Sequence, residues 1–189
     1  MKTGTKWLIA IGIVIGIIVI WIAGIYNGLV DAEQSVETAR ANIQTQLQRR
    51  SDLIPNLVST VRGYASQEKE IFTDVANARA RLAGATDISE EADADTALSS
   101  ALSRLLLVVE NYPELKSNQN FQDLSVQLEG TENRIAIARQ DYNDAVTRYN
   151  KKRRRFPASI ISNIFGFEAQ PYFEASEGVE QVPLVDFSN

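Results

Sequence analysis

The chain begins with one long apolar run, and a periodic mixture of apolar and polar residues follows it. Residues 7–25 are 19 consecutive residues without a charge. A helix of that length spans ~28 Å at 1.5 Å per residue, close to the thickness of the hydrocarbon core of a bilayer. Trp7, Trp21 and Tyr26 lie at or near its ends, where aromatic side chains meet the membrane interfaces. The pattern predicts a single transmembrane anchor within residues 1–28.

A cleavable signal peptide is the alternative interpretation of this run. The run exceeds the about 7–15 apolar residues typical of signal peptides, and no A-x-A pattern follows it, so retention as an anchor is favoured. Lys2 and Lys6 precede the run, while acidic residues come first after it. The positive-inside rule therefore favours a cytoplasmic amino terminus, with the rest of the chain outside the cytoplasm.

Beyond the anchor, apolar residues recur at steps of three and four, which is the spacing of one helix face. The first stripe predicts a helix over residues 29–83. It consists of Leu29, Val36, Ile43, Leu47, Ile54, Leu57, Val61, Tyr64, Ile71, Val75, Ala78 and Leu82.

Similar spacing predicts helices over residues 91–111 and 121–152, and two helical turns within 158–167. The acidic stretch 87–95 is expected to be a solvated loop. No segment shows the alternation of a strand, and short connections between helices imply antiparallel neighbours. The expected fold is all-α, with an up-and-down bundle of about four long antiparallel helices over residues 29–173. An acidic, flexible tail is expected over residues 174–189.

One stretch interrupts the helical pattern, "QRRSDLIPNLV" at residues 48–58. Pro55 removes one backbone hydrogen bond to the carbonyl of Ser51, so the helix either kinks there or a new helix begins with Asp52 as its cap. An unbroken helix over 29–83 would span ~80 Å, against ~32 and ~48 Å for the next two. Its membrane-proximal half would then need other copies or partners to cover it.

The composition excludes several common kinds of catalytic and metal-binding site. The sequence contains no His and no Cys, which removes the commonest general base, the thiol nucleophile and the usual zinc and haem ligands. A site made of carboxylates alone remains possible, but no catalytic, cofactor or metal-binding residue is predicted. After the anchor the chain carries 17 basic and 24 acidic residues, a net charge of −7. This balance argues against nucleic acid as a partner.

Three segments behind the anchor resemble the LemA family: "QLQRRSDLIPNLVSTVRGYASQEKE" (46–70), "NYPELKSNQNFQDLSVQLEGTENRIAIARQDYNDAVTRYN" (111–150) and "FPASIISNIFGFEAQPYFEA" (156–175). The resemblance implies a helical bundle anchored in a bacterial inner membrane, without established enzymatic activity. Relatives are often associated with a membrane-bound zinc metalloprotease, and one branch is linked to bacterial organelle membranes. Ser51 departs from the family, where an aromatic residue is common.

The motif residues have two interpretations. They form either a recognition patch for a partner helix, or salt bridges and core packing within the bundle. If packing brings residues 131–134 near Arg49, Arg50 and Asp52, one interhelical ion-pair network results. The interaction candidates are Arg49, Arg50, Asp52, Pro55, Asn56, Gly63, Tyr64, Glu132, Asn133, Arg134, Phe156 and Pro157.

A basic run, unusual for the family, comes next: Lys151, Lys152, Arg153, Arg154 and Arg155. It either binds anionic lipid headgroups, or completes a cationic helix end before a segment that closes the core. In the first case an apolar face would insert into the bilayer, made of Phe156, Ile160, Ile161, Ile164 and Phe165.

Together these features predict a non-enzymatic, membrane-anchored scaffold or adaptor. It would assemble as a homo-oligomer or bind another membrane protein. The alternatives are a membrane-remodelling oligomer that acts on the bilayer and an accessory protein of a membrane-bound metalloprotease.

Overall fold

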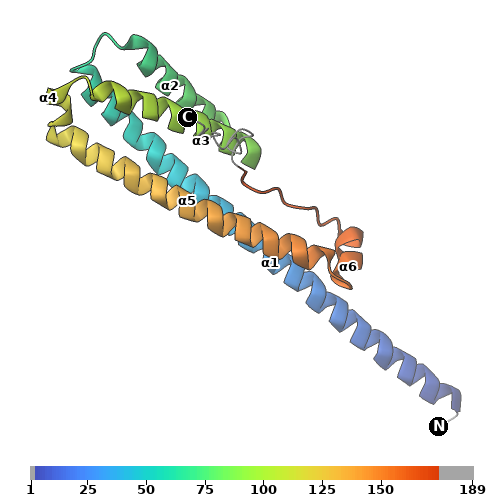
Figure 1. The fold of residues 1–189 in the computed structure, drawn as a ribbon. Helices are drawn as coiled ribbons and strands as arrows, with labels where there is room; N and C mark the ends of the chain where they lie inside the picture. Colours follow the sequence, from blue (N-terminus) through green and yellow to red (C-terminus); the bar gives the residue numbers. More distant parts are fainter. Residues whose placement is uncertain (1–2, 175–189) are drawn as a thin grey trace, which may run out of the picture. The chain divides into compact units, whose positions relative to one another are not determined.

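A computed structural model describes residues 3–174 of the chain. These residues form six helices and no strand, which confirms the all-α prediction. The helices are α1 (Thr3–Arg62), α2 (Lys69–Gly84), α3 (Ile88–Val109), α4 (Pro113–Lys116), α5 (Gln119–Arg154) and α6 (Ala158–Phe165) (Figure 1). The predicted tail lies outside the described residues, apart from Glu174.

Two compact units divide the chain. Unit 1 comprises the chain up to Ala41 together with Asp141–Gln170, and unit 2 comprises Asn42–Gln140 and the chain from Pro171. Unit 1 therefore contains the start of α1, the end of α5 and α6. Unit 2 contains the rest of α1 and α5 with α2, α3 and α4.

α1 runs without a break through Pro55 and ends at Arg62. Of the two alternatives at Pro55, a new helix that begins with Asp52 as its cap is therefore excluded, and the single helix predicted over residues 29–83 is wrong. A turn follows α1, in which the amides of Tyr64 and Ala65 both donate to the carbonyl of Val61. The apolar spacing concealed this turn because Tyr64 and Ile71, seven residues apart, kept the predicted stripe at helical spacing across it.

Because α1 ends at Arg62, the part of α1 beyond the apolar segment is about as long as α5. From Leu29 to Arg62 the helix spans ~50 Å, and the 36 residues of α5 span ~54 Å at the same rise. Leu29 and Val36 are buried within unit 1. The membrane-proximal half of the predicted stripe is thus covered by the chain itself. Of the two alternatives that followed from the helix lengths, a broken helix and coverage by other copies or partners, the structure shows the break, which lies after Arg62.

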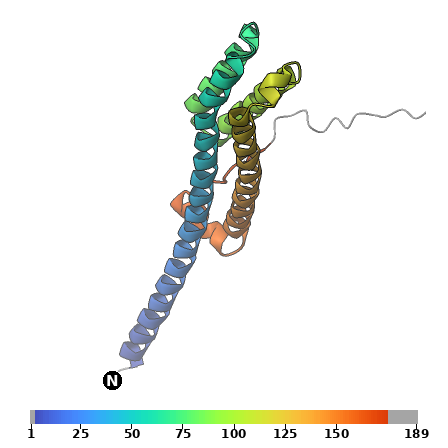
Figure 2. The same cartoon turned by 90° about the vertical axis from the view of Figure 1, so that its left-hand side faces the viewer.

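In unit 1, α1 carries the segment of the described chain that is long and apolar enough to cross a bilayer, and none of its most apolar window is buried in the protein. The C-terminal end of α5 lies beside α1 in both views, and so does α6 (Figure 1 and Figure 2). The core of unit 1 contains two fully buried tyrosines, Tyr142 and Tyr149, together with Leu29, Val36, Val146 and Ile161.

In unit 2, α2 and α3 pack against each other. Asp87 caps α3, and its carboxylate accepts hydrogen bonds from the amides of Ser89 and Glu90, both at 2.9 Å. The loop predicted over 87–95 is therefore wrong, since these residues cap and begin α3. The predicted stripe of α3 is confirmed, with Leu98, Leu102, Leu105 and Val109 all buried.

Candidate interaction site: a buried charge network and an adjoining groove

Four charged side chains from three helices meet in unit 2, and we call them the charge network: Arg50 of α1, Asp95 of α3, and Glu132 and Arg139 of α5. Arg50 Nη1 lies 2.7 Å from Asp95 Oδ1 and 2.9 Å from Glu132 Oε2. Arg139 Nη2 contacts the second oxygen of Asp95. Two cations and two anions therefore compensate one another.

The network extends from the interior to the surface. Asp95 is 0% exposed and Arg50 is 5% exposed, whereas the side chain of Glu132 is 48% exposed. Burial lowers the pKa of Arg50, and the nearby carboxylate of Glu132 opposes that shift. Burial also lowers the pKa of Arg139, and the positive charge of Arg50 adds to the effect. Because desolvation offsets much of the attraction between buried ions, such a network fixes the register of helices more than it stabilises them.

Arg50 and Asp95 face inward because each is in phase with the apolar stripe of its helix. Arg50 lies three residues after Leu47 and four before Ile54. In the same way, Asp95 lies three residues before Leu98. The ring of Phe173 closes the network on the α5 side, 4.8 Å from the guanidinium carbon of Arg139.

The predicted contact between the two sequence motifs is confirmed for Arg50 and Glu132. The other charged motif residues, Arg49, Asp52 and Arg134, are exposed and lie outside the network, as does Asn133. Asp52 instead accepts a hydrogen bond from Gln48 within α1, at 2.8 Å.

Sequence reasoning missed Asp95 and Arg139. A usable signal existed, because each is a charged residue in phase with the buried leucine, isoleucine or tyrosine positions of its helix. Asp95 was assigned to a solvated loop because its neighbours are acidic. With that assignment, its position three residues before Leu98, on the buried face of a helix, was overlooked.

Pro55 is accommodated by a side chain from another helix. The proline lacks the amide that would donate to the carbonyl of Ser51. Arg79 of α2 donates to that carbonyl at 3.0 Å, and to the Ser51 hydroxyl at 3.1 Å. Arg79 thus satisfies the carbonyl in place of the missing amide, whereas the side chain of Asn56 is exposed.

The remaining motif residues lie at the ends of helices. Gly63 follows α1, and the exposed Tyr64 accepts a hydrogen bond from Asn118 at 3.1 Å through its hydroxyl oxygen. Phe156 is exposed, and Pro157 directly precedes α6.

The basic run divides between structural contacts and exposed charge. In unit 1 the ammonium group of Lys152 donates to the carbonyl of Gly28, and Arg153 Nε donates to the carbonyl of Phe167 at 2.7 Å. The other three residues are exposed: Lys151, Arg154 and Arg155. Ile161 is buried, so its predicted place in a membrane-inserting face is wrong.

An apolar groove adjoins the charge network, between α1, α3 and α5. Its volume is about 480 Å³, and its lining contains four leucines, three serines and three charged residues. Leu106 is 42% exposed in this groove, and Leu107 and Val126 are exposed on α3 and α5. The lining residues are Arg50, Leu57, Ser99, Leu102, Ser103, Leu106, Ser125, Leu128, Glu129 and Glu132. An apolar groove with a polar rim suits the apolar face of a partner helix.

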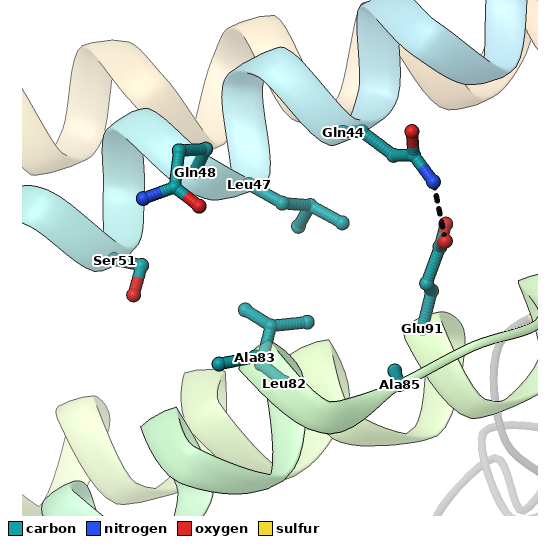
Figure 3. Close-up of a pocket in the computed structure, with 8 residues that line it drawn as sticks. All are labelled: Gln44, Leu47, Gln48, Ser51, Leu82, Ala83, Ala85 and Glu91. Atoms are coloured by element: carbon teal, nitrogen blue, oxygen red, sulfur yellow. Dashed lines mark hydrogen bonds between the residues drawn. The ribbon is translucent and has the colours of Figure 1, made fainter.

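A second, smaller groove lies between α1, α2 and α3 in the same unit. Figure 3 shows Leu47 of α1 and Leu82 of α2 facing each other across it, and Gln44 donating to Glu91 at 2.8 Å. Its volume is about 150 Å³, below the ~300 Å³ from which small-molecule sites usually start. Within residues 3–174, moreover, no three potential metal ligands among His, Cys, Asp and Glu gather at one place.

Residues 39–187 match the sequence model of the LemA family. The chain belongs to the LemA family. The matched LemA region contains the charge network and every residue of the apolar groove, and it begins after the apolar segment Trp7–Ile25.

Three relatives share between 23% and 29% sequence identity with this LemA-family chain. It is 29% identical to the magnetosome protein MamQ 2 of Paramagnetospirillum magneticum, over 79% of this chain and 64% of that protein. It is 26% identical to the magnetosome protein MamQ of Magnetospirillum gryphiswaldense, over 78% and 64%. It is also 23% identical to the LemA protein of Metamycoplasma hominis, over 90% and 78%. The chain thus spans just under two thirds of the length of the MamQ relatives.

Proposed function

We propose that this chain is a non-enzymatic, membrane-anchored scaffold or adaptor, which binds the amphipathic helix of a partner in the groove between α1, α3 and α5. The observation that carries this proposal is the groove itself. Leu106 in its leucine lining is 42% exposed, so apolar area remains available after unit 2 has folded.

The apolar segment Trp7–Ile25 supports anchoring in a membrane as a single-pass protein. We infer a bacterial inner membrane, with the amino terminus in the cytoplasm, from Lys2 and Lys6 before the segment and acidic residues after it. The anchor would hold the groove near other proteins of the same membrane and raise their effective concentration.

The charge network supports a structural role in place of a catalytic one. Its two arginines and two carboxylates are directed at one another, and no His or Cys occurs in the sequence. A general acid or base needs a group that can reach a substrate proton, whereas Asp95 is enclosed by Arg50 and Arg139.

The partner is either a second copy of this chain or another membrane protein, and a membrane-bound metalloprotease remains a candidate. Glu129, an exposed acidic residue in the lining of the groove, favours a partner helix that carries a basic residue beside its apolar face. The net charge of −7 after the anchor disfavours nucleic acid.

Photo-cross-linking in native membranes tests the groove. A benzophenone amino acid at Leu106 should give a discrete cross-linked product, because a bound helix would lie within its reach. Ile137 is the matched control, an exposed apolar residue of α5 that does not line the groove.

The substitution Leu128→Glu, on the other side of the groove, should abolish the product formed from Leu106. If Leu106 and Ile137 give the same diffuse products, the groove has no specific occupant. A specific product that survives Leu128→Glu would place the partner elsewhere.

Membrane remodelling is the second candidate function, favoured by the exposed apolar residues of α6 and by relatives named magnetosome proteins. It predicts that adding the purified full-length protein deforms vesicles. Vesicles that keep their shape at full protein incorporation would exclude it.

A further inference from the structure

α6 carries apolar side chains on two faces. Ala158, Ile161 and Ser162 are buried in unit 1. Ile160 and Ile164 on the other face are 50% and 69% exposed, and Phe165 at the end of the helix is 56% exposed. Packing within the unit explains the first face only. A helix that is apolar on both sides is typical of a segment that meets a second apolar phase.

The position of α6 beside the end of the membrane span indicates that this second apolar phase is the bilayer. The ring of Tyr26 makes edge contacts with the rings of Phe165 and Phe167, with centroids 4.9 and 5.6 Å apart. Tyr26 directly follows Ile25, the last residue of the apolar segment. α6 is therefore fixed to α1 at the end of the predicted membrane span.

The end of α5 is fixed at the same level. Lys152 donates to the carbonyl of Gly28, so the side chain of Lys152 connects the end of α5 to α1 at this position. Tyr26 and Gly28 lie within ~5 Å of the end of the apolar segment, at 1.5 Å per residue. The polar layer on each side of a bilayer is itself ~5–7 Å deep.

The charges beside α6 suit an anionic surface. Lys151, Arg154 and Arg155 are exposed at the end of α5, immediately before α6. None of the three has a carboxylate partner among residues 3–174. Exposed cations next to an apolar helix face are the combination by which interfacial helices bind anionic lipid.

We propose that α6 docks on the surface of the membrane that α1 spans. Ile160, Ile164 and Phe165 enter the boundary between headgroups and acyl chains. The three exposed cations bind anionic headgroups, and Phe156, which is 80% exposed, adds to the apolar contact. This inference rests on the membrane anchoring proposed above, and it gives unit 1 two attachments to the bilayer in place of one.

Site-directed labelling can test the docking, because the chain contains no cysteine. Single cysteines at Ile164, Val14 and Val126 would each carry a nitrobenzoxadiazole label in the full-length protein. The protein is reconstituted in vesicles of phosphatidylcholine and phosphatidylglycerol. Val14 reports on the membrane span and Val126 on an exposed position of unit 2, and all three replaced side chains are exposed in the protein.

Docking predicts that quenchers attached to lipid chains reduce the fluorescence at Val14 and Ile164, and that iodide in solution quenches only the label at Val126. A quencher near the headgroups should act more strongly at Ile164, and one near the chain ends more strongly at Val14. Replacing the three exposed cations with glutamine, or omitting phosphatidylglycerol, should remove most of the lipid quenching at Ile164 and none at Val14.

Four results would overturn the proposal. Iodide quenching at Ile164 with lipid quenching intact at Val14 would disprove docking while the anchor stands, and lipid quenching at neither position would disprove the anchor as well. Protection of Ile164 from both quenchers would mean that a protein, not lipid, covers α6. Lipid quenching at Ile164 that is insensitive to charge would overturn the proposed headgroup binding.

Discussion

Asp95 makes ion pairs with two arginines from different helices while it is fully buried. Arg50 and Glu132 could be expected to meet, because both belong to motifs and antiparallel packing was the economical arrangement. Asp95 and Arg139 could not be paired in the same way, since phase shows only that a residue faces inward. The pairing of the inward-facing charges depends on the axial positions of three helices relative to one another. A single sequence does not show those positions.

Asp95→Asn should lower the free energy of unfolding by about 3–5 kcal/mol. The substitution keeps the shape of the side chain but leaves the buried Arg50 and the partly buried Arg139 without their shared anion. Thermal or denaturant unfolding of the full-length protein in detergent, followed by far-ultraviolet circular dichroism, measures the change. Asp144→Asn, an exposed position of α5, is the matched control and should change stability by less than ~0.5 kcal/mol. Equal effects of the two substitutions would show that the network is not a structural centre.

Tyr149 gives a pH-dependent prediction. Its hydroxyl donates to the carbonyl of Glu168 at 2.8 Å, and burial, followed by the negative charge of Glu33, raises the pKa of its phenol above the ordinary value of 10.0. A raised pKa means that the folded state holds its proton more tightly than the unfolded state. The stabilisation is therefore complete below pH 10.0 and is lost as the pH rises through the folded-state pKa.

Tyr149→Phe should thus cost roughly 1 kcal/mol at neutral pH, where the hydrogen bond is lost. The difference in stability from the wild type should shrink as the pH rises above 10.0, because only the wild type then loses the phenol contribution. The free energies of unfolding of the wild type and of Tyr149→Phe, measured across this pH range, test the prediction. A difference between them that stays constant or grows would contradict the raised pKa of Tyr149.

At the scale of helices, apolar spacing predicted which faces are buried better than where helices end. Ten of the twelve residues of the first predicted stripe are buried, while Tyr64 is exposed and Ile71 is half-buried. Tyr64 lies in the turn that separates α1 from α2, and Ile71 lies in the first turn of α2. Pro55 attracted attention as the expected break, yet the helix continues through it because Arg79 supplies the missing donor from α2. Such a compensating contact, 28 residues away in the sequence, cannot be recognised from local spacing.

A double-mutant cycle tests this compensation. Arg79→Ala should cost about 1–3 kcal/mol in the wild type, since it leaves the buried carbonyl of Ser51 without a donor. In a Pro55→Ala background the amide of residue 55 can donate instead, so the cost of Arg79→Ala should fall by roughly 1 kcal/mol. Arg81→Ala, at an exposed position of α2, should show no coupling to Pro55. Additive effects of Arg79→Ala and Pro55→Ala would contradict the account.

At the scale of the whole chain, the two units present different surfaces. Unit 1 exposes the apolar and basic residues around α6, and unit 2 exposes the leucine-lined groove beside its charge network. The sequence predicted the membrane span and the bundle because both depend on composition and period. The groove could not be predicted, because its residues come from three helices and only folding brings them together.

The protein mass of particles extracted from native membranes with their lipid tests the central claim most directly. A scaffold that binds through the groove should be found in particles whose protein mass exceeds the 21.0 kDa of one chain. Leu106→Glu should reduce them to a single chain, and Ile137→Glu, outside the groove, should leave them intact. Wild-type particles that contain one chain and no partner, or an assembly that survives Leu106→Glu, would contradict the proposed function.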